Sequence, residues 1–151
     1  GRTEADPAAQ RLVRNVLTYA SAWKPAARRK VVYAGDAAGK AHLVFEAEGS
    51  TGAKLPETLE RYTDKTLTDR NVLREQMSKI GESGYAVECD EFSEDVSAVA
   101  VPIRDYTRSL VGTLAVVGPT HRLTEEAIHN AIAPVLLKAG GELSRRLGFH
   151  A

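Results

Sequence analysis

Few residues of this 151-residue chain are arranged for chemistry, and the most suggestive segment is an incomplete phosphate loop. Residues 35–40 read Gly-Asp-Ala-Ala-Gly-Lys. A phosphate-binding loop needs four residues between its glycines and a Ser or Thr after its lysine to hold magnesium. Gly39 follows Gly35 one residue too early, and Ala41 follows the lysine. The segment therefore does not predict nucleotide binding.

The histidines and acidic residues do not form a metal-binding pattern either. No two histidines have a helical spacing that would put both on one metal ion; they are His42, His121, His129 and His150. The acidic segment lacks the calcium-loop spacing and is interpreted as a solvated turn; its members are Glu88, Asp90, Glu91, Glu94 and Asp95. The serines lack the G-x-S-x-G context of a hydrolase nucleophile. We therefore expect no enzyme activity, no metal and no cofactor.

Composition narrows the class of protein further. The chain is 43% hydrophobic and 26% charged with a formal net charge of zero, which is typical of a globular domain rather than of one that holds DNA by itself. Cys89 has no cysteine partner in the chain and fits a reducing cytoplasm. No apolar run approaches the roughly 20 residues of a membrane span. The start at Gly1 instead of Met suggests a fragment of a larger protein.

Helices are expected where apolar residues recur at spacings of three and four behind a capping residue. Thr68 is the expected cap of a helix with apolar positions Val72, Leu73, Met77 and Ile80, and Gly84 lies just past its end. The other predicted helices cover residues 6–23, capped by Asp6, 37–48, capped by Asp36, 55–62, and 125–147, capped by Thr124.

Strands are expected at residues 31–33, 85–87, 96–103 and 110–117, with residues 105–108 as a hairpin loop between the last two. Residues 88–95 are expected to form a turn or loop. This order of helices and strands predicts an α/β (α+β) fold with a largely antiparallel sheet flanked by helices.

The two long strands have two apolar faces, because side chains alternate along a strand. Bulky residues share one face, where Val99, Val101 and Ile103 meet Leu114 and Val116. The other face is rich in small residues; it carries Ala98, Ala100, Thr113, Ala115 and Val117. Small residues on a covered face leave room for a ligand. The alternative is that a helix or loop packs closely against them.

Several segments together resemble one family, the effector-binding domain of IclR-type bacterial transcription regulators, whose fold is GAF-like. The resemblance covers residues 31–148 and rests on the order and spacing of its segments. They are Ala37–Ala41, Glu82–Ala86, Val99–Asp105, Val117–Pro119 with Arg122–Thr124, and Glu142–Gly148. Residues 24–33 are too few for the strand pair that the family has at this place. Either the fold is trimmed at the sheet edge and the pocket rim, or residues are missing from the sequence before Val31.

The resemblance implies a ligand site on the small-residue face. A family acidic position matches Glu88, a cysteine position matches Ala98, and two serine positions match Ala115 and Val117. The helix-start positions match Ala37 and Ala38, while Ala100 and Thr113 complete the candidate site. The polar groups that bind small keto acids are mostly replaced, which predicts a less polar effector such as an aromatic or branched acid. Glu88 suits a hydroxyl or amine donor, or else points to solvent.

The family also implies the organisation of the parent protein. Residues 1–30 would form an N-terminal helix and linker, and residues 31–151 the effector-binding domain. A winged helix-turn-helix outside this chain would contact DNA, and the subunits would form a homodimer or tetramer. No membrane contact is expected. The alternatives are a stand-alone GAF-like binding module and, with less support, an enzyme that acts on a small carboxylate.

Overall fold

The computed structural model describes residues 36–47 and 58–150 of the chain. The chain divides into two compact units, Gly1–Lys30 and Val31–Ala151, and the described residues all belong to the second. The predicted helix at 6–23 and the predicted strand at 31–33 lie outside the described residues, as do residues 55–57 of another predicted helix.

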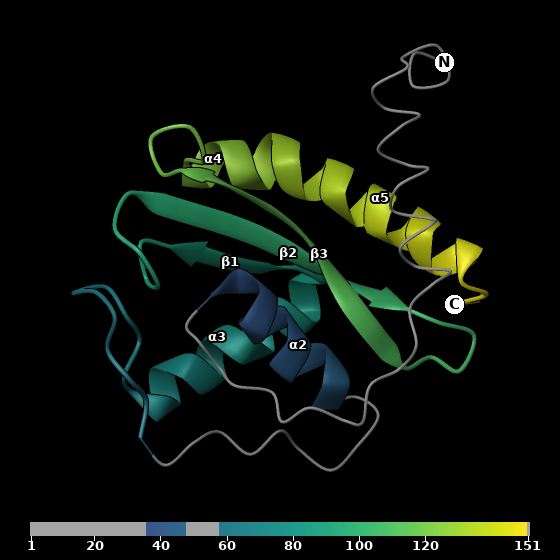
Figure 1. The fold of residues 1–151 in the computed structure, drawn as a ribbon, viewed down its shortest axis with the longest axis horizontal. Helices are drawn as coiled ribbons and strands as arrows, with labels where there is room; N and C mark the ends of the chain where they lie inside the picture. The colour runs from purple at the N-terminus through teal and green to yellow at the C-terminus, as the bar shows by residue number, and fades with distance from the viewer. Residues whose placement is uncertain (1–35, 48–57, 151) are drawn as a thin grey trace. The chain divides into compact units, whose positions relative to one another are not determined.

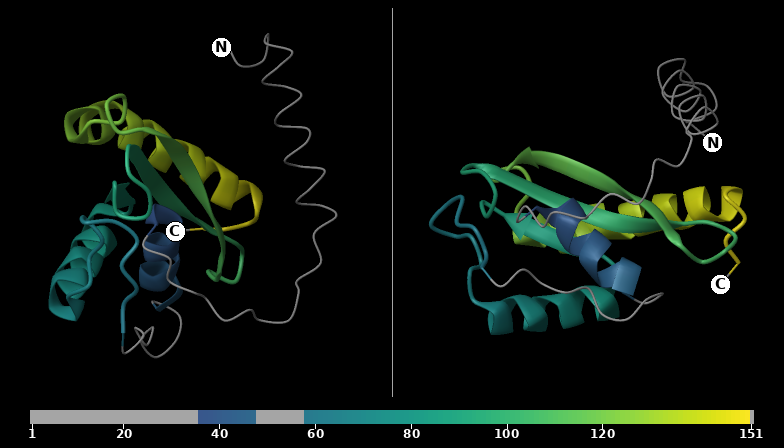
Figure 2. Two further views of the ribbon diagram at one scale, coloured as in Figure 1. Left: turned by 60° about the vertical axis from the view of Figure 1, so that its left-hand side comes forward. Right: turned by 60° about the horizontal axis from the view of Figure 1, so that its bottom comes forward.

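The described unit has three layers, with a sheet between helices (Figure 1). The antiparallel sheet has the order β1-β2-β3, formed by Ala86–Cys89, Val96–Arg104 and Leu110–Pro119. Helices α2 (Ala37–Ala47) and α3 (Arg70–Ser83) lie on one side, while α5 (Ala133–Arg146) crosses the other, an arrangement that Figure 2 shows from two further directions. The predicted α+β class with an antiparallel sheet is confirmed.

The register of the sheet confirms the predicted division of its two faces. Ala98 pairs with Val117 and Ala100 with Ala115, so these residues share a face. That face forms one hydrophobic cluster with α2 and α3; it contains Ala37, Ala41, Val44, Phe45, Ile80, Ala86, Ala98 and Ala100. The bulky face forms the other cluster with α5 and its approach; it contains Val99, Val101, Leu123, Ile128, Ala133 and Leu136.

Helix ends follow local chemistry, with one cap one residue later than predicted. The Asp36 carboxylate accepts a hydrogen bond from the backbone N–H of Gly39, as expected of the α2 cap. Asp69, not Thr68, caps α3, and its carboxylate accepts from the N–H groups of Asn71 and Val72. Gly84 ends α3 as predicted, with a φ of 80° that favours glycine.

Residues 58–62 are not helical, which corrects the prediction of a helix over 55–62. The N–H groups of Tyr62 and Thr63 both donate to Oγ1 of Thr66, at 3.0 and 2.8 Å. A side chain therefore takes up these donors within a turn, a competition that favours Thr in turns over helices.

The final helix is interrupted, which also differs from the prediction. Thr124 caps α4 (Glu125–Ala127) as expected, but a π-helical segment, η1 (Ile128–Ile132), precedes α5, which ends at Arg146. Pro134 lies in the first turn of α5 and has no N–H to donate to the carbonyl four residues earlier. The proline therefore accounts for the loss of regular α-helical bonding before α5, a signal present in the sequence that the predicted continuous helix ignored.

The close approach of α5 to β2 generates a stability prediction. A methyl group added at Gly140 would lie 2.7 Å from Cγ2 of Val101, so we expect Gly140→Ala to lower the free energy of unfolding by about 1–3 kcal/mol. The matched control is Gly141→Ala in the same helix, where an added methyl meets nothing within 4 Å. That variant should gain roughly 0.5–1 kcal/mol. Urea unfolding measures both, and a Gly140→Ala variant as stable as the original chain would contradict the packing argument.

Candidate functional site

The structure brings the predicted site residues of the sheet onto one face. Glu88 pairs with Ala98, which pairs with Val117, and this row lies beside the row that contains Ala100 and Ala115. Thr113 lies opposite Pro102 on the same face. Helix α2 packs against all three strands, and its first residues are Ala37 and Ala38.

These residues are not equally accessible. Ala37 and Ala100 have no exposed surface and Ala98 has 5%, so the alternative of close helix packing describes this part of the face. Small residues on both sides let α2 approach the sheet closely. Toward β3 the face opens: Ala38 and Thr113 are half-buried, Ala115 is exposed and Val117 is 64% exposed. The accessible part of the candidate site is therefore centred on β3.

Glu88 is buried rather than directed to solvent, so that alternative is wrong. It is the third residue of β1, although the sequence predicted a turn or loop there, and only 2% of its surface is exposed. Its Oε1 accepts hydrogen bonds from the backbone N–H groups of Glu91 at 2.8 Å and Phe92 at 3.1 Å. Burial raises the pKa of the Glu88 carboxyl above its usual range, and these two donors oppose the rise.

A buried ion pair lies beside Glu88, and the sequence analysis did not predict it. Lys40 of α2 has no exposed surface, and its Nζ donates to Oε1 of Glu91 at 2.6 Å and to the carbonyl of Val87 at 3.2 Å. Burial lowers the pKa of Lys40, while the charges of Glu91 and Glu88 oppose that change.

The sequence did contain a signal for this pair. Ala37, Lys40, Ala41 and Val44 have the spacing of one helix face, and the other three residues are apolar. A lysine on a face that must be buried needs a partner, because unpaired charges are almost never fully buried.

The acidic segment is mostly ordered within the fold, which corrects its interpretation as a solvated turn. Asp90 is 8% exposed, and its carboxylate accepts from Lys65 Nζ at 2.6 Å and from the Thr120 hydroxyl at 2.5 Å. These two hydrogen bonds hold the pKa of Asp90 below its usual range. Glu94 and Asp95 are exposed, as the sequence suggested.

The site offers binding contacts rather than catalytic groups. No group of three or more His, Cys, Asp or Glu side chains in the described part of the chain is placed to hold a metal ion. Cavities lined by described residues include one of about 420 Å³ and one of about 300 Å³, and no candidate residue lines either. Among the described helices, none has the length and hydropathy of a membrane span.

Comparison with known proteins shows which proteins the chain resembles. Residues 21–145 match the family model described as bacterial transcriptional regulator IclR C-terminal. The HTH-type transcriptional regulator XynR of Escherichia coli K12 is 30% identical over 133 residues, which cover 87% of this chain and 52% of XynR. BhcR of Paracoccus denitrificans is 35% identical over 86 residues, which cover 57% of this chain and 30% of BhcR. The chain thus spans about half the length of these relatives or less.

Solved structures share the fold. The IclR of Thermotoga maritima is 31% identical with a TM-score of 0.68, over 85% of this chain and 52% of that chain. The inducer-binding domain of PobR from Acinetobacter, solved as a double mutant with 3-hydroxybenzoic acid, is 21% identical with a TM-score of 0.65 over 82% of this chain and 73% of that chain. The relatives are regulators of transcription and not enzymes, as the sequence predicts.

The buried carboxyl of Glu88 generates a prediction about pH. Its pKa is raised above 4.5 in the folded chain, so its contribution to stability is largest below pH 4.5 and is lost as the pH rises through the folded pKa. Glu88→Gln keeps an acceptor oxygen and removes this dependence. We therefore expect the free energy of unfolding of Glu88→Gln, relative to the original chain, to increase from pH 4.5 upwards in urea titrations.

The exposed Glu94 provides the matched control for this measurement. Glu94→Gln should follow the pH profile of the original chain over this range. If the profiles of Glu88→Gln and the original chain stay parallel, the carboxyl of Glu88 has an unperturbed pKa and the argument from its burial fails.

Proposed function

Because the chain belongs to the IclR family of bacterial transcriptional regulators and matches its C-terminal domain, we propose that it binds a small organic effector. Binding would alter DNA binding by a separate domain of the longer protein. A ligand can shift a regulator between states only if it binds those states with different affinities. In this proposal the subunits form a dimer or tetramer, so that a shift in their pairing changes the spacing of two DNA-binding domains.

The observation that carries the proposal is the open, apolar part of the sheet face. Ala115 and Val117 are exposed on β3, and Thr113 on the same face adds a hydroxyl. Ala38 lies at the start of the helix that packs against this face. The ligand site would thus use Ala38, Thr113, Ala115 and Val117 directly. Ala37, Ala98 and Ala100 would support it from the core, and Glu88 would lie at its inner end.

The chemistry of this face favours an effector that is less polar than pyruvate or glyoxylate. Each hydroxyl that is missing from Ala115 and Val117 removes a hydrogen bond worth roughly 0.5–1.5 kcal/mol. Apolar contact contributes about 25 cal/mol per Å² of ligand surface that is covered, which favours a larger carbon skeleton. The buried Glu88 carboxylate disfavours a second anion at the inner end of the site, and its Oε1 already accepts from two backbone N–H groups. An aromatic acid bound with its ring against β3 and its carboxylate toward solvent, away from Glu88, meets these conditions.

Titration calorimetry tests this specificity. We expect 3-hydroxybenzoate or a branched aliphatic acid to bind more tightly than pyruvate and glyoxylate. Ala115→Ser should leave the fold intact and shift the preference toward the small acids by roughly 2- to 10-fold, because it restores one hydrogen bond. The exposed Ala139→Ser on α5 is the matched control and should not change the order of affinities. Micromolar binding of the keto acids alone would contradict the proposed site.

The division of labour between domains is tested by a gel-shift assay. This chain has a formal net charge of zero, so we expect it not to bind operator DNA specifically at about physiological salt. A longer protein that contains both this chain and a winged helix-turn-helix should bind the same DNA, with an affinity that the effector changes. Saturable, sequence-dependent binding by this chain without that domain would overturn the division.

A further inference from the structure

One of the two cavities lies at the edge of the described sheet, away from the proposed effector site. It has a volume of about 420 Å³ and is lined by α3, β1 and the segment from α4 to η1. Val87 and Cys89 of β1 line it, together with Tyr85 just before β1; these residues alternate with Ala86 and Glu88 and belong to the bulky face of the sheet. Volumes of this size are typical of small-molecule sites.

Two residues that line the cavity each carry a buried oxygen with no hydrogen-bond partner among the described residues. Glu91 lines it and is 7% exposed, and its Oε2 has no hydrogen-bond partner in the described part of the chain. Gln76 of α3 also lines it, and its buried Oε1 is unpartnered among the same residues. A buried acceptor without a donor costs about 1–3 kcal/mol, so such atoms are normally paired.

The ion pair described above does not satisfy Glu91. Lys40 donates to Oε1 and to the Val87 carbonyl, and no hydrogen bond from it reaches Oε2. The carboxylate therefore has one oxygen committed to the core and one available to a donor. Two acceptors in one cavity select a molecule that brings hydrogen-bond donors.

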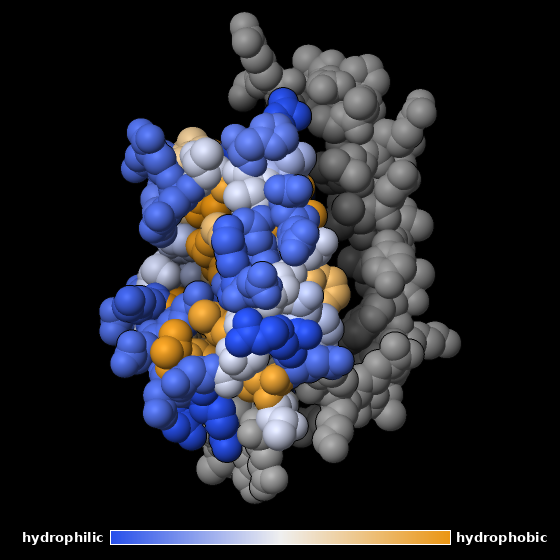
Figure 3. Space-filling model, turned by 90° about the vertical axis from the view of Figure 1, so that its left-hand side faces the viewer, coloured by the Kyte–Doolittle hydropathy of each residue, from blue (hydrophilic) through white to orange (hydrophobic). Residues whose placement is uncertain are grey.

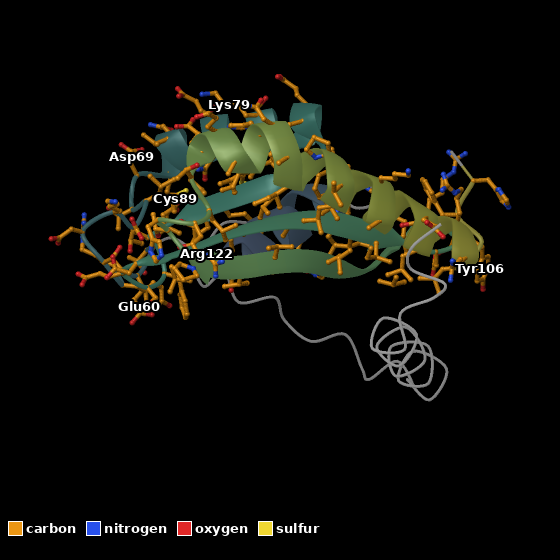
Figure 4. All side chains as sticks on the ribbon, turned by 90° about the horizontal axis from the view of Figure 1, so that it is seen from above. Glu60, Asp69, Lys79, Cys89, Tyr106 and Arg122 are labelled. Atoms are coloured by element: carbon orange, nitrogen blue, oxygen red, sulfur yellow. The ribbon has the colours of Figure 1, made fainter. Side chains whose placement is uncertain are left out.

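The remaining lining suits a short organic ligand. Ile80, Val87 and Cys89 supply apolar or weakly polar surface. Figure 4 shows where Cys89 lies, at the end of the described unit opposite Tyr106. The Tyr85 hydroxyl and His129 Nδ1, 2.5 Å apart, line the other wall. His129 belongs to η1, and π-helical turns occur frequently at functional sites. Figure 3 shows hydrophobic residues between mostly hydrophilic ones at the end where α4 lies.

We infer that this cavity is a second binding site, for a small molecule with a nitrogen donor head group, either a primary amide or an ammonium, and a short hydrocarbon tail. The head group donates to Glu91 Oε2 and Gln76 Oε1, and the tail contacts Ile80 and Val87. An amide and an ammonium share the donor chemistry and differ in charge, so probes of each kind separate them.

Cys89 provides the readout, because it is the only cysteine in the 151-residue chain and lines the cavity. Its alkylation by iodoacetamide is followed at neutral pH with butyramide, butylammonium or butyrate present. We expect butyramide, butylammonium or both to slow labelling in a saturable way. Butyrate has nearly the shape of butyramide but presents no donor at neutral pH, so it should not protect Cys89. In urea, labelling should be insensitive to every probe.

Variants separate this site from the proposed effector site. Gln76→Met removes one acceptor from a half-buried side chain and should weaken protection by roughly 2- to 10-fold. Thr113→Val alters the other face and should leave protection unchanged, whatever it does to effector binding. Glu91→Gln also disturbs the ion pair with Lys40, so its effect on the protection of Cys89 is interpreted together with that of Gln76→Met.

Three results would overturn the inference. One is that neither butyramide nor butylammonium protects Cys89, which would mean that water satisfies Glu91 Oε2 and Gln76 Oε1. Another is equal protection by butyrate. The third is that Thr113→Val abolishes protection while Gln76→Met leaves it unchanged, which would place the probes on the other face. None of these depends on whether an aromatic acid binds at β3, so the two proposals can fail separately.

Discussion

The placement of one buried charge constrains much of this fold. Lys40 lies on the apolar face of α2, and its ammonium must find acceptors wherever that helix packs. Among the described residues, the Val87 carbonyl of β1 and the Glu91 carboxylate just after β1 supply them. A buried ion pair adds little net stability, yet removal of one partner costs about 3–5 kcal/mol because the other charge is left alone. The pair therefore fixes the position of α2 on the sheet more than it strengthens the fold.

Close packing on both faces of β2 likewise fixes the positions of α2 and α5 on the sheet. On one face, alanines of α2 meet alanines of β1 and β2. On the other face, Gly140 brings the backbone of α5 to the side chain of Val101, where even a methyl group has no room. Small residues thus set the separation of the layers. Among the described strands, the exposed side chains of the small-residue face belong to β3, at the edge of the described sheet.

Much of the architecture could be predicted from the sequence because local signals are strong there. Period-two alternation identified β2 and β3, and Asp36, Gly84 and Thr124 mark helix ends by chemistry that needs no tertiary context. The errors arose where the outcome depends on contacts distant in sequence or on one overlooked residue. Thr66 takes up backbone donors at 62 and 63 while its hydroxyl donates to the carbonyl of Glu91.

The candidate site was only partly predictable, for a related reason. Alternation and resemblance placed its residues on one face correctly, but neither indicates how closely a helix covers that face. The burial of Glu88 could not be predicted either, because an acidic run is usually solvated. The fold shows that the turn after β1 instead buries Asp90 and Glu91. The spacing of Lys40 with Ala37, Ala41 and Val44 was the clue to a buried partner.

The way in which the buried polar groups are used separates recognition from catalysis here. A general acid or base must hold or release a proton at a reacting atom. Glu88 is occupied by two backbone donors, Lys40 by two acceptors and Asp90 by Lys65 and Thr120. These contacts hold the turn at the end of β1 in place. The accessible face, by contrast, offers hydrocarbon and a single hydroxyl. Such a surface can distinguish ligands by shape and polarity. The oxygen of Glu91 that the core leaves unused is the exception, and it too can accept a donor without transferring a proton.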